Sequence, residues 1–408
     1  MQILVQKYGG TSVGDQKSRQ HVIRHIKQAL SENFKVIVVV SALGRNPEPY
    51  ATDSLLNLVS KRATQTLKRE TDMLMSCGEI ISSVVLTSEL TDENIEATAL
   101  TGPQAGILTD ESFGDATIKK VNPKRIFDTF NHVDVIIVAG FQGQTSSGDL
   151  TTLGRGGSDT TAASLAAATK AKRVDIFTDV NGIMTADPRM VENARCLDVV
   201  TYMEICHLAY QGAKVVHPRA VEIAMHAEVP LRVRSTYTDD LGTLITSLRQ
   251  PTGQRIPDRL VTGVTHIDDI SQVVVQANTD DQTIQANVFR AMAEANISVD
   301  FINISQNDIA YTVSNEHVEQ TERILDTLAY NYDIQQHFAK VSVVGAGMTG
   351  VPGVASRIVQ ALTKENIQIY QAADSHTTIW VLIRDTDLPK ALNALHEAFE
   401  LNISPKMI

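Results

Sequence analysis

The most regular feature of this sequence is a series of short, continuously apolar runs separated by stretches with helical spacing. Continuous apolar runs are typical of strands in a parallel sheet that is covered on both faces, whereas half-exposed strands alternate. Helices are expected between them, over 17–31 and over the alanine-rich stretch 162–169. The pattern therefore predicts an α/β domain whose strands are the runs Ile3 to Val5, Val36 to Val40, Val133 to Ala139 and Val174 to Phe177.

Small or polar residues follow each of these strands. Open α/β sheets bind their ligands in the crevice beyond the carboxyl ends of the strands. We therefore expect a binding site formed by the loops Gly9-Gly10, Ser41 to Gly44, Gly140 to Gly143, and Thr178-Asp179.

The first of these loops, in the sequence K-Y-G-G-T-S, has the chemistry of a phosphate site. Gly9 and Gly10 expose backbone N–H groups without a Cβ in the way, and Lys7 adds a compact positive charge. The loop matches neither the G-x-x-x-x-G-K-[ST] nor the G-x-G-x-x-G pattern. On its own it could equally be an ordinary glycine turn after a strand.

A second loop, R-G-G-S-D-T-T, begins at Arg155 and opens the alanine-rich helix. It combines a glycine-rich backbone, a helix N-terminus, a guanidinium that can grip a carboxylate at two points, and a carboxylate at Asp159. The alternative is a flexible turn followed by an N-cap at Ser158 or Asp159.

Three further residues carry weaker signals. Glu79 lies in C-G-E inside a helical stretch over 64–90, where Gly78 could kink the helix; otherwise Glu79 is a solvated side chain. Asp179, at a strand end, suits a metal-bound phosphate or a ribose. Lys214, in a G-A-K turn, would by itself be interpreted as a surface lysine.

The composition changes near residue 250, and an internal repeat follows. Q-P-T-G-Q at 250–254 marks a linker. Beyond it, Asn296-Ile297 and Asn366-Ile367 correspond, as do Ile309 and Ile379, at a spacing of seventy residues. Helices are expected over 283–295 and 353–364, which indicates two ferredoxin-like βαββαβ modules. The expected division is a domain over 1–248, a linker over 249–262, and modules over 263–338 and 339–408.

Composition and charge narrow the class of protein. The chain has 408 residues, 43% of them hydrophobic and 20% charged, as expected for a globular protein with two or three domains. A net charge of −11 without a basic run argues against nucleic acid as a partner. The three cysteines form no C-x-x-C pair, no signal peptide precedes the first strand, and no uninterrupted apolar stretch is long enough to span a bilayer. These features predict a cytoplasmic protein that does not enter the membrane.

Taken together, K-Y-G-G-T-S, C-G-E, R-G-G-S-D-T-T, F-T-D-V and the paired modules resemble the aspartokinases over essentially the whole chain. The sequence is most similar to the single-function Gram-positive type, which is inhibited by lysine or diaminopimelate. The resemblance implies an amino-acid-kinase fold followed by two ACT domains. It also implies ATP-dependent phosphorylation of the β-carboxylate of L-aspartate, with Mg²⁺, as the first step of the lysine/diaminopimelate, threonine and methionine pathways.

The resemblance also implies roles for individual residues, with none assigned as a metal ligand. Lys7 would stabilise the transferring phosphoryl group, Asp159 would orient Lys7, Glu79 would hold the substrate ammonium, and Arg155 its α-carboxylate. The expected substrate residues are Thr52, Glu79, Arg155, Gly156, Gly157 and Ser158; the expected nucleotide residues are Lys7, Tyr8, Gly9, Gly10, Ser41, Thr178, Asp179 and Lys214.

In aspartokinases, effector amino acids bind where ACT domains meet, and the chain is therefore expected to form a homodimer through these domains. Diaminopimelate is the first expectation for the effector and lysine the second, with threonine less favoured. The expected effector residues are Asp300, Phe301, Ile302, Asn303 and Gln306 in one module, and Tyr370, Gln371, Ser375, His376 and Thr377 in the other.

Two alternatives stay open at this point. One is a catalytically silent amino-acid sensor, and the other is a related kinase with a different carboxylate acceptor. The presence of Lys7, Arg155 and Asp159 favours an active enzyme, and the paired modules and C-G-E favour aspartate as the acceptor.

Overall fold

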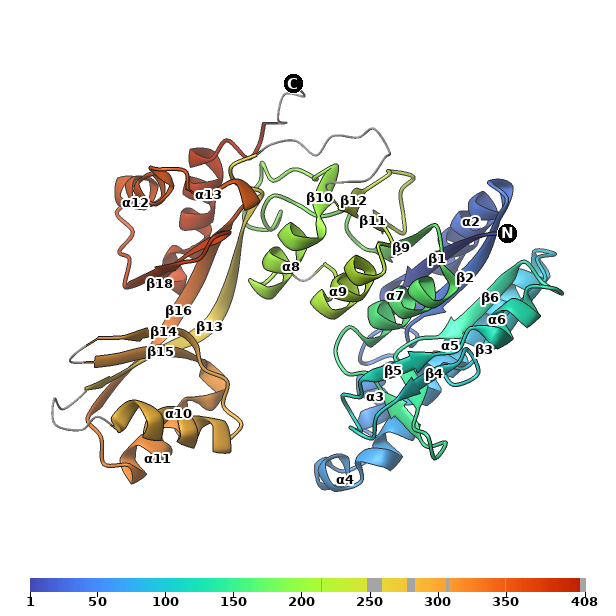
Figure 1. Ribbon diagram of the computed structural model, residues 1–408, viewed down its shortest axis with the longest axis horizontal. Helices are drawn as coiled ribbons and strands as arrows, with labels where there is room; N and C mark the ends of the chain where they lie inside the picture. Colours follow the sequence, from blue (N-terminus) through green and yellow to red (C-terminus); the bar gives the residue numbers. More distant parts are fainter. Residues whose placement is uncertain (214, 248–258, 277–282, 306–307, 349, 404–408) are drawn as a thin grey trace. The chain divides into compact units, whose positions relative to one another are not determined.

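The computed structural model describes residues 1–213, 215–247, 259–276, 283–305, 308–348 and 350–403, and it contains two compact units (Figure 1). Unit 1 comprises Met1–Ile183, Cys196–Tyr210 and Lys214–Ile256. Unit 2 comprises Met184–Arg195, Gln211–Ala213 and Pro257–Ile408. The expected linker falls mostly on 249–258, outside the described residues.

Unit 1 is built on an eight-stranded sheet in the order β10-β12-β11-β9-β1-β2-β6-β3. Every neighbouring pair is parallel except β11 and β12. The residues of β2 alternate between the two faces, and Val36 to Val40 are all fully buried, as the apolar runs predict. The strands are β1 (Gln2–Tyr8), β2 (Phe34–Val40), β3 (Ala97–Leu100), β6 (Val135–Ala139), β9 (Arg173–Thr178), β10 (Val199–Thr201), β11 (Leu231–Ser235) and β12 (Thr243–Thr246).

Helices cover both faces of this sheet. Apolar side chains of α2 and α5 share one core cluster with β1, β2 and β6, while α7 packs on β1 from the other side. A small second sheet has the order β5-β4-β7-β8. The helices are α1 (Gly10–Val13), α2 (Gln16–Ser31), α3 (Thr52–Leu56), α4 (Lys61–Thr66), α5 (Lys68–Asp92), α6 (Lys124–Thr129), α7 (Gly157–Thr169), α8 (Tyr202–Tyr210) and α9 (Pro218–His226); the small strands are β4 (Ile107–Thr109), β5 (Ile118–Val121), β7 (Gln142–Gln144) and β8 (Leu150–Thr152).

Helix α5 departs from its sequence expectation in two ways. It continues without interruption through Gly78, where a Cβ would lie 2.8 Å from Ala42 Cβ, so the glycine permits close packing. By length and composition alone this 25-residue helix could also cross a membrane. Its buried side carries Asp72, which accepts hydrogen bonds from Gly114 and Thr152, so polar contacts build α5 into unit 1.

Unit 2 holds a six-stranded antiparallel sheet in the order β14-β15-β13-β16-β18-β17. In Figure 1 its helices lie on one side of the sheet, with α10 beside α11 and α12 beside α13. The strands are β13 (Gly263–Gln276), β14 (Asp300–Ile304), β15 (Asp308–Ser314), β16 (Tyr332–Val344), β17 (Gln371–Asp374) and β18 (Thr378–Arg384); the helices are α10 (Ile284–Glu294), α11 (Val318–Thr327), α12 (Val354–Lys364) and α13 (Leu388–Ala398), with 3₁₀ turns at Asn315–His317, Ala346–Met348 and Asp385–Asp387.

The seventy-residue repeat is confirmed element by element. Helices α10 and α12 begin seventy positions apart, as do β15 and β18. Asn296 and Asn366 follow the first helix of each module with φ of 56° and 57°. Asparagine tolerates this left-handed conformation better than most residues, which explains why it recurs there.

The two modules nevertheless exchange a strand. The second half of β16 pairs with β18 and also with the start of β13, where Gly263 faces Val344. The strand that completes the second module therefore precedes the first module in the chain. We still propose that the first module occupies most of 263–338 and the second most of 339–408. The segment 263–267 is the exception, because it pairs within the second module.

A second exchange involves the segment Met184–Arg195, here called the excursion, which lies within the proposed 1–248 domain but packs in unit 2. Ala186 and Val191 are buried in one cluster with α12 and α13. Thr185 Oγ1 lies 2.9 Å from His396 Nε2 on α13, and Asn393 donates to the carbonyl of Met190. The excursion is therefore part of the core of the second module.

Val191→Ala is expected to destabilise unit 2 by roughly 2 kcal/mol, because it removes two buried methyl groups and leaves a cavity. Val359→Ala is the matched control, since Val359 is 48% exposed on α12. Urea denaturation would be followed at Trp380, which lies on β18. An unchanged transition in Val191→Ala would contradict the placement of the excursion.

Candidate functional site

The carboxyl end of β1 lies between those of β9 and β2. Strands β11, β12 and β10 follow beyond β9 on one side, and β6 and β3 follow beyond β2 on the other. This reversal of strand order is the position at which open α/β sheets bind ligands. Ser41 N–H donates to the carbonyl of Tyr8, and Gly44 N–H donates to the carbonyl of Gly10. The first two predicted loops are therefore brought together by backbone hydrogen bonds.

The turn Gly9–Ser12, here called the phosphate turn, is tightly packed against the second loop. A Cβ at Gly10 would lie 2.5 Å from the carbonyl oxygen of Gly44 and 2.9 Å from that of Ala42. Any larger residue at position 10 would displace this backbone. Lys7 Nζ lies 3.8 Å from where a Cβ would project from Gly9, so the ammonium is next to the turn.

Lys7 and Asp159 form an ion pair with Nζ 2.7 Å from Oδ1. The side chains are only 14% and 11% exposed. Lys7 is the penultimate residue of β1, and Asp159 lies in the first turn of α7, whose N-terminus favours negative charge. Asp159 Oδ2 also accepts a hydrogen bond from the backbone N–H of His217. A cation is thus held in a fixed position at the sheet edge.

The glycine-rich loop before α7 is shaped by backbone conformation. Gly156 is the N-cap of α7 with φ of 67°, and a Cβ there would lie 2.2 Å from Cγ of His217. The adjacent Ser158 accepts a hydrogen bond from Ser41, with 2.9 Å between the hydroxyl oxygens. The loops at 41–44 and 154–159 therefore meet, as the sequence predicts.

Glu79 is buried rather than solvated, at 2% exposure. Its Oε1 accepts a hydrogen bond from the N–H of Ala42 in the second loop. Its Oε2 has no hydrogen-bond partner within the described part of the chain. Burial raises the pKa of this carboxyl to about 8. A buried acceptor without a partner is suited to a cationic ligand group.

The remaining predicted residues have less defined surroundings. Thr52 is the first residue of α3. Tyr50 and Leu55, which lie on either side of it in the chain, pack close to Gly78 of α5. Arg155 is exposed. Thr178 ends β9, and its hydroxyl donates to the exposed carboxylate of Asp179. Lys214 lies outside the described residues.

The acidic, histidine and cysteine side chains near the site indicate what kind of metal ion the protein could hold. Over the residues that the structure describes, no group of three His, Cys, Asp or Glu side chains is placed for metal binding. Asp179 is the one acidic side chain among the predicted nucleotide residues. This set fits an ion such as Mg²⁺, which takes one or two carboxylates and draws its other ligands from substrate phosphates and water.

The predicted effector stretches meet in unit 2. Gln371 Nε2 donates to the carbonyl of Phe301, and Gln272 donates to Gln371. Asp300 already forms an ion pair with Lys340, which is buried, so an effector ammonium would have to share or replace that partner. Tyr370 packs on Phe338 in the same cluster. Ile302, Asn303, Ser375 and His376 are exposed, Thr377 is half-buried, and Gln306 is not among the described residues.

Sequence reasoning missed several backbone contributions to the site. The N–H of Ala42 on Glu79 and the N–H of His217 on Asp159 come from segments distant in the chain. The small-residue loop at 41–44 did signal the first, but backbone donors leave no residue-type signal, and so the second had none.

Comparisons with known proteins agree with this arrangement. Residues 2–235 match the amino acid kinase family model, and residues 333–397 match an ACT domain model. The chain is 56% identical over 403 residues to aspartokinase 1 of Bacillus subtilis, covering 98% of this chain and all of the relative. It is 40% identical over 410 residues to an aspartokinase of Geobacillus stearothermophilus, covering 98% of each.

Solved structures give the same result. Aspartokinase III of E. coli in complex with aspartate and ADP has a TM-score of 0.77 at 26% identity, covering 98% of this chain and all of that one. The same enzyme in complex with lysine and aspartate has a TM-score of 0.76 at 26% identity, covering 97% of this chain and 99% of that one. The chain therefore belongs to the aspartokinase family.

Proposed function

We propose that this enzyme transfers the γ-phosphoryl group of ATP to the β-carboxylate of L-aspartate, forming 4-phospho-L-aspartate in the cytoplasm. The reaction is the first step toward lysine and diaminopimelate, threonine and methionine. The observation that carries the proposal is the Lys7–Asp159 ion pair beside the phosphate turn. It is supported by the E. coli enzyme of the same fold that binds aspartate and ADP.

The reaction brings two anions together, so the work of the protein is to position them and to neutralise charge. Lys7 stabilises the transferring phosphoryl group, while Asp159 holds the ammonium of Lys7 in place. The aspartate β-carboxylate is already ionised at pH 7, so no general base is needed. The nucleotide is bound by the residues at the ends of the central strands and by one further lysine: Tyr8, Gly9, Gly10, Ser41, Thr178, Asp179 and Lys214. Asp179 is the protein carboxylate of this set that would help to hold Mg²⁺ bound with ATP, and the ion would supply further positive charge.

Opposite charges orient the acceptor. Glu79 holds the aspartate ammonium on its unpartnered Oε2, and Arg155 grips the α-carboxylate. Thr52, Gly156, Gly157 and Ser158 complete the aspartate site. With both ends of the amino-acid group fixed, the β-carboxylate is the group directed at the phosphoryl donor.

A hydroxamate assay with ATP and a panel of acidic amino acids tests this proposal. Hydroxamate should form with L-aspartate and with no other acceptor at comparable kcat/KM. Formation with another acceptor would favour a related carboxylate kinase. No turnover with any acceptor would favour a catalytically silent sensor.

Lys7→Ala is expected to fold normally and to lose at least about a hundredfold in kcat, since single electrostatic contacts at developing charge contribute about 10²–10³ in rate. The control is Lys27→Ala, whose lysine forms an exposed surface ion pair with Glu93. Retention of more than about a tenth of the wild-type kcat by Lys7→Ala would remove Lys7 from the chemistry.

The affinity for aspartate is expected to rise with pH. Because the pKa of Glu79 is raised to about 8, most of this carboxyl is protonated at pH 7, and ammonium binding requires the ionised form. The aspartate KM should therefore fall by about tenfold per unit between pH 6 and 7 and level off above about 8. Glu79→Gln should have a higher KM without this slope. A slope that persists in Glu79→Gln would assign the titration elsewhere.

We further propose that the enzyme forms a homodimer through its ACT modules and is inhibited by an amino acid bound between the two effector stretches. The binding of lysine by the E. coli enzyme supports this. Diaminopimelate is our first candidate, lysine our second, and threonine is less favoured. The polar groups of the effector would contact Asp300, Asn303 and Gln306. The other residues proposed to surround it are Phe301, Ile302, Tyr370, Gln371, Ser375, His376 and Thr377.

Asn303→Ala should raise the effector concentration for half inhibition by about tenfold, the loss expected for one or two polar contacts. Asn402→Ala is the control, since Asn402 is exposed in the same unit and belongs to neither stretch. Equal inhibition of the two variants by every pathway amino acid would show that the effector site is misplaced.

The excursion offers a covalent route from effector to nucleotide. It follows directly from β9 and the Asp179 loop, and Leu197 N–H donates to the Ile183 carbonyl where the chain returns to unit 1. Within unit 2, the Thr185 hydroxyl contacts His396 and accepts from the N–H of Arg195. A rearrangement of the second module would therefore pull on the chain beside the nucleotide residues.

Thr185→Val should leave kcat within about twofold but weaken effector inhibition by about tenfold, within the usual range of coupling energies. Thr321→Val is the matched control, because Thr321 is also fully buried in unit 2 and its hydroxyl has no hydrogen-bond partner among the described residues. Wild-type inhibition of Thr185→Val would exclude this contact from the coupling.

A further inference from the structure

Thr236 follows β11 and joins three separate segments of unit 1. Its N–H donates to the carbonyl of Thr178 at 2.9 Å, and its carbonyl oxygen lies 3.0 Å from Nε2 of His25. Its hydroxyl lies 2.7 Å from the hydroxyl of Ser12. Thr236 and Ser12 are both fully buried. The N–H, the carbonyl and the hydroxyl of Thr236 therefore each contact a different segment: β9, α2 and the phosphate turn.

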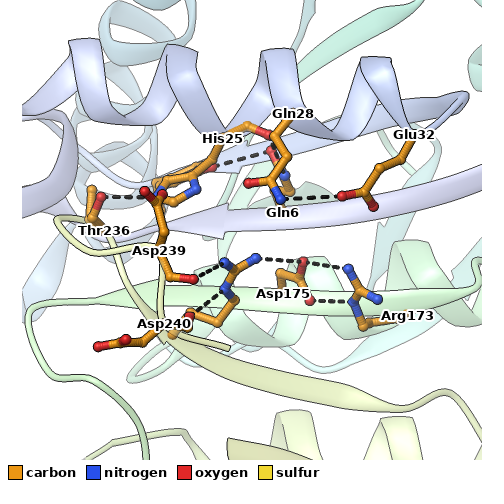
Figure 2. Close-up of polar contacts among 11 residues, drawn as sticks. Gln6, His25, Gln28, Glu32, Arg173, Asp175, Thr236, Asp239 and Asp240 are labelled. Atoms are coloured by element: carbon orange, nitrogen blue, oxygen red, sulfur yellow. Dashed lines mark hydrogen bonds and ion pairs between the residues drawn. The ribbon is translucent and has the colours of Figure 1, made fainter. Parts of the chain in front are cut away.

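The contact with His25 fixes the protonation of the ring. Burial lowers the pKa of His25 to about 4, so the ring is neutral near pH 7. Because a carbonyl oxygen can only accept, Nε2 carries the proton and donates to Thr236. Figure 2 shows His25 reaching from α2 to Thr236, with Gln6 of β1 bonded to the backbone of His25.

Aromatic stacking places this junction directly beneath the site. The His25 ring lies 4.5 Å from the Phe177 ring, and Phe177 stacks on Tyr8 at 4.6 Å between ring centroids. Phe177 immediately precedes Thr178 on β9, and Tyr8 immediately precedes Gly9 on β1. The strand ends on either side of the nucleotide residues thus rest on one aromatic layer.

The phosphate turn depends on contacts of this kind for its position. Helix α1 has only four residues and no side-chain cap at Gly9, so it has little stability of its own. The Ser12 N–H donates to the Gly9 carbonyl, which makes Ser12 part of the turn itself. Among the described residues, Thr236 is the side-chain partner of the Ser12 hydroxyl, and it follows β11 of the sheet.

We propose that Thr236 is a positioning residue for phosphoryl transfer. Its hydroxyl fixes the phosphate turn and its N–H fixes the end of β9, so that the two backbone segments that bind the nucleotide keep one spacing. The inference rests on the proposed function, which assigns Gly9, Gly10, Thr178 and Asp179 to the nucleotide. Thr236 itself touches neither substrate.

The test compares Thr236→Val, Thr236→Ser and Thr246→Val. Valine keeps the shape of threonine but leaves the Ser12 hydroxyl without a partner, whereas serine keeps the bond. Thr246 is the matched control, a buried strand threonine of the same unit whose hydroxyl has no partner among the described residues.

For Thr236→Val, kcat/KM for ATP should fall by about tenfold, with the aspartate KM within about twofold of wild type. Direct titration with ATP should show the same loss of affinity. Thr236→Ser and Thr246→Val should match wild type in both measurements.

A purely structural role would lower the melting temperature of Thr236→Val without this selective effect on ATP, and that result would overturn the proposal. Equal loss in Thr246→Val would also overturn it. A wild-type protein that bound ATP but formed no hydroxamate would contradict the proposed function, yet the ATP titration would still decide the role of Thr236. A wild-type protein that bound no ATP would overturn both.

Discussion

The ion pair between Lys7 and Asp159 is the interaction that the structure around the site holds in position. Burying two charges costs desolvation that their attraction only partly offsets, so such a pair contributes little to folding stability. It is formed because β1 ends where α7 begins, at the reversal of strand order between β9 and β2. The parallel sheet, the left-handed Gly156 and the close packing at Gly10 all hold the partners in place. The fold thus fixes a cation at the edge of the sheet, at the place where the proposed function brings two anionic substrates together.

Under the proposed function, each unit uses a carboxylate to bind an amino-acid ligand. Burial raises the pKa of Glu79 to about 8, so the proposed binding of an ammonium group to this carboxylate is linked to a proton equilibrium. The carboxylate of Asp300 in unit 2 differs from that of Glu79, because it already forms an ion pair with Lys340. Under the proposed function, an effector ammonium would therefore compete with Lys340 for Asp300. Because the excursion continues from the chain beside Asp179, the proposed regulation would need no direct contact between the ligands.

Residue type and spacing were enough to predict the sheet, the phosphate turn, the R-G-G-S-D loop and the paired modules. Each depends on local pattern, such as the apolar run Val36 to Val40 or asparagine recurring at 296 and 366. Three features had no such signal. Gly78 permits close packing against Ala42, which lies in the loop after β2. The strand at 263–267 pairs within the second module, and the excursion packs with helices about two hundred residues further along the chain. All three are set by tertiary contacts, which a single sequence does not display.

The most direct test of the account follows the oxygen atom that attacks the phosphoryl group. With L-aspartate labelled with ¹⁸O in the β-carboxylate, the enzyme would turn over ATP in the presence of hydroxylamine. Hydroxylamine attacks the acyl carbon, so the released phosphate keeps the bridging oxygen. The account predicts one ¹⁸O atom in that phosphate. Phosphate without label, or β-hydroxamate that forms without phosphate release, would contradict transfer to the β-carboxylate.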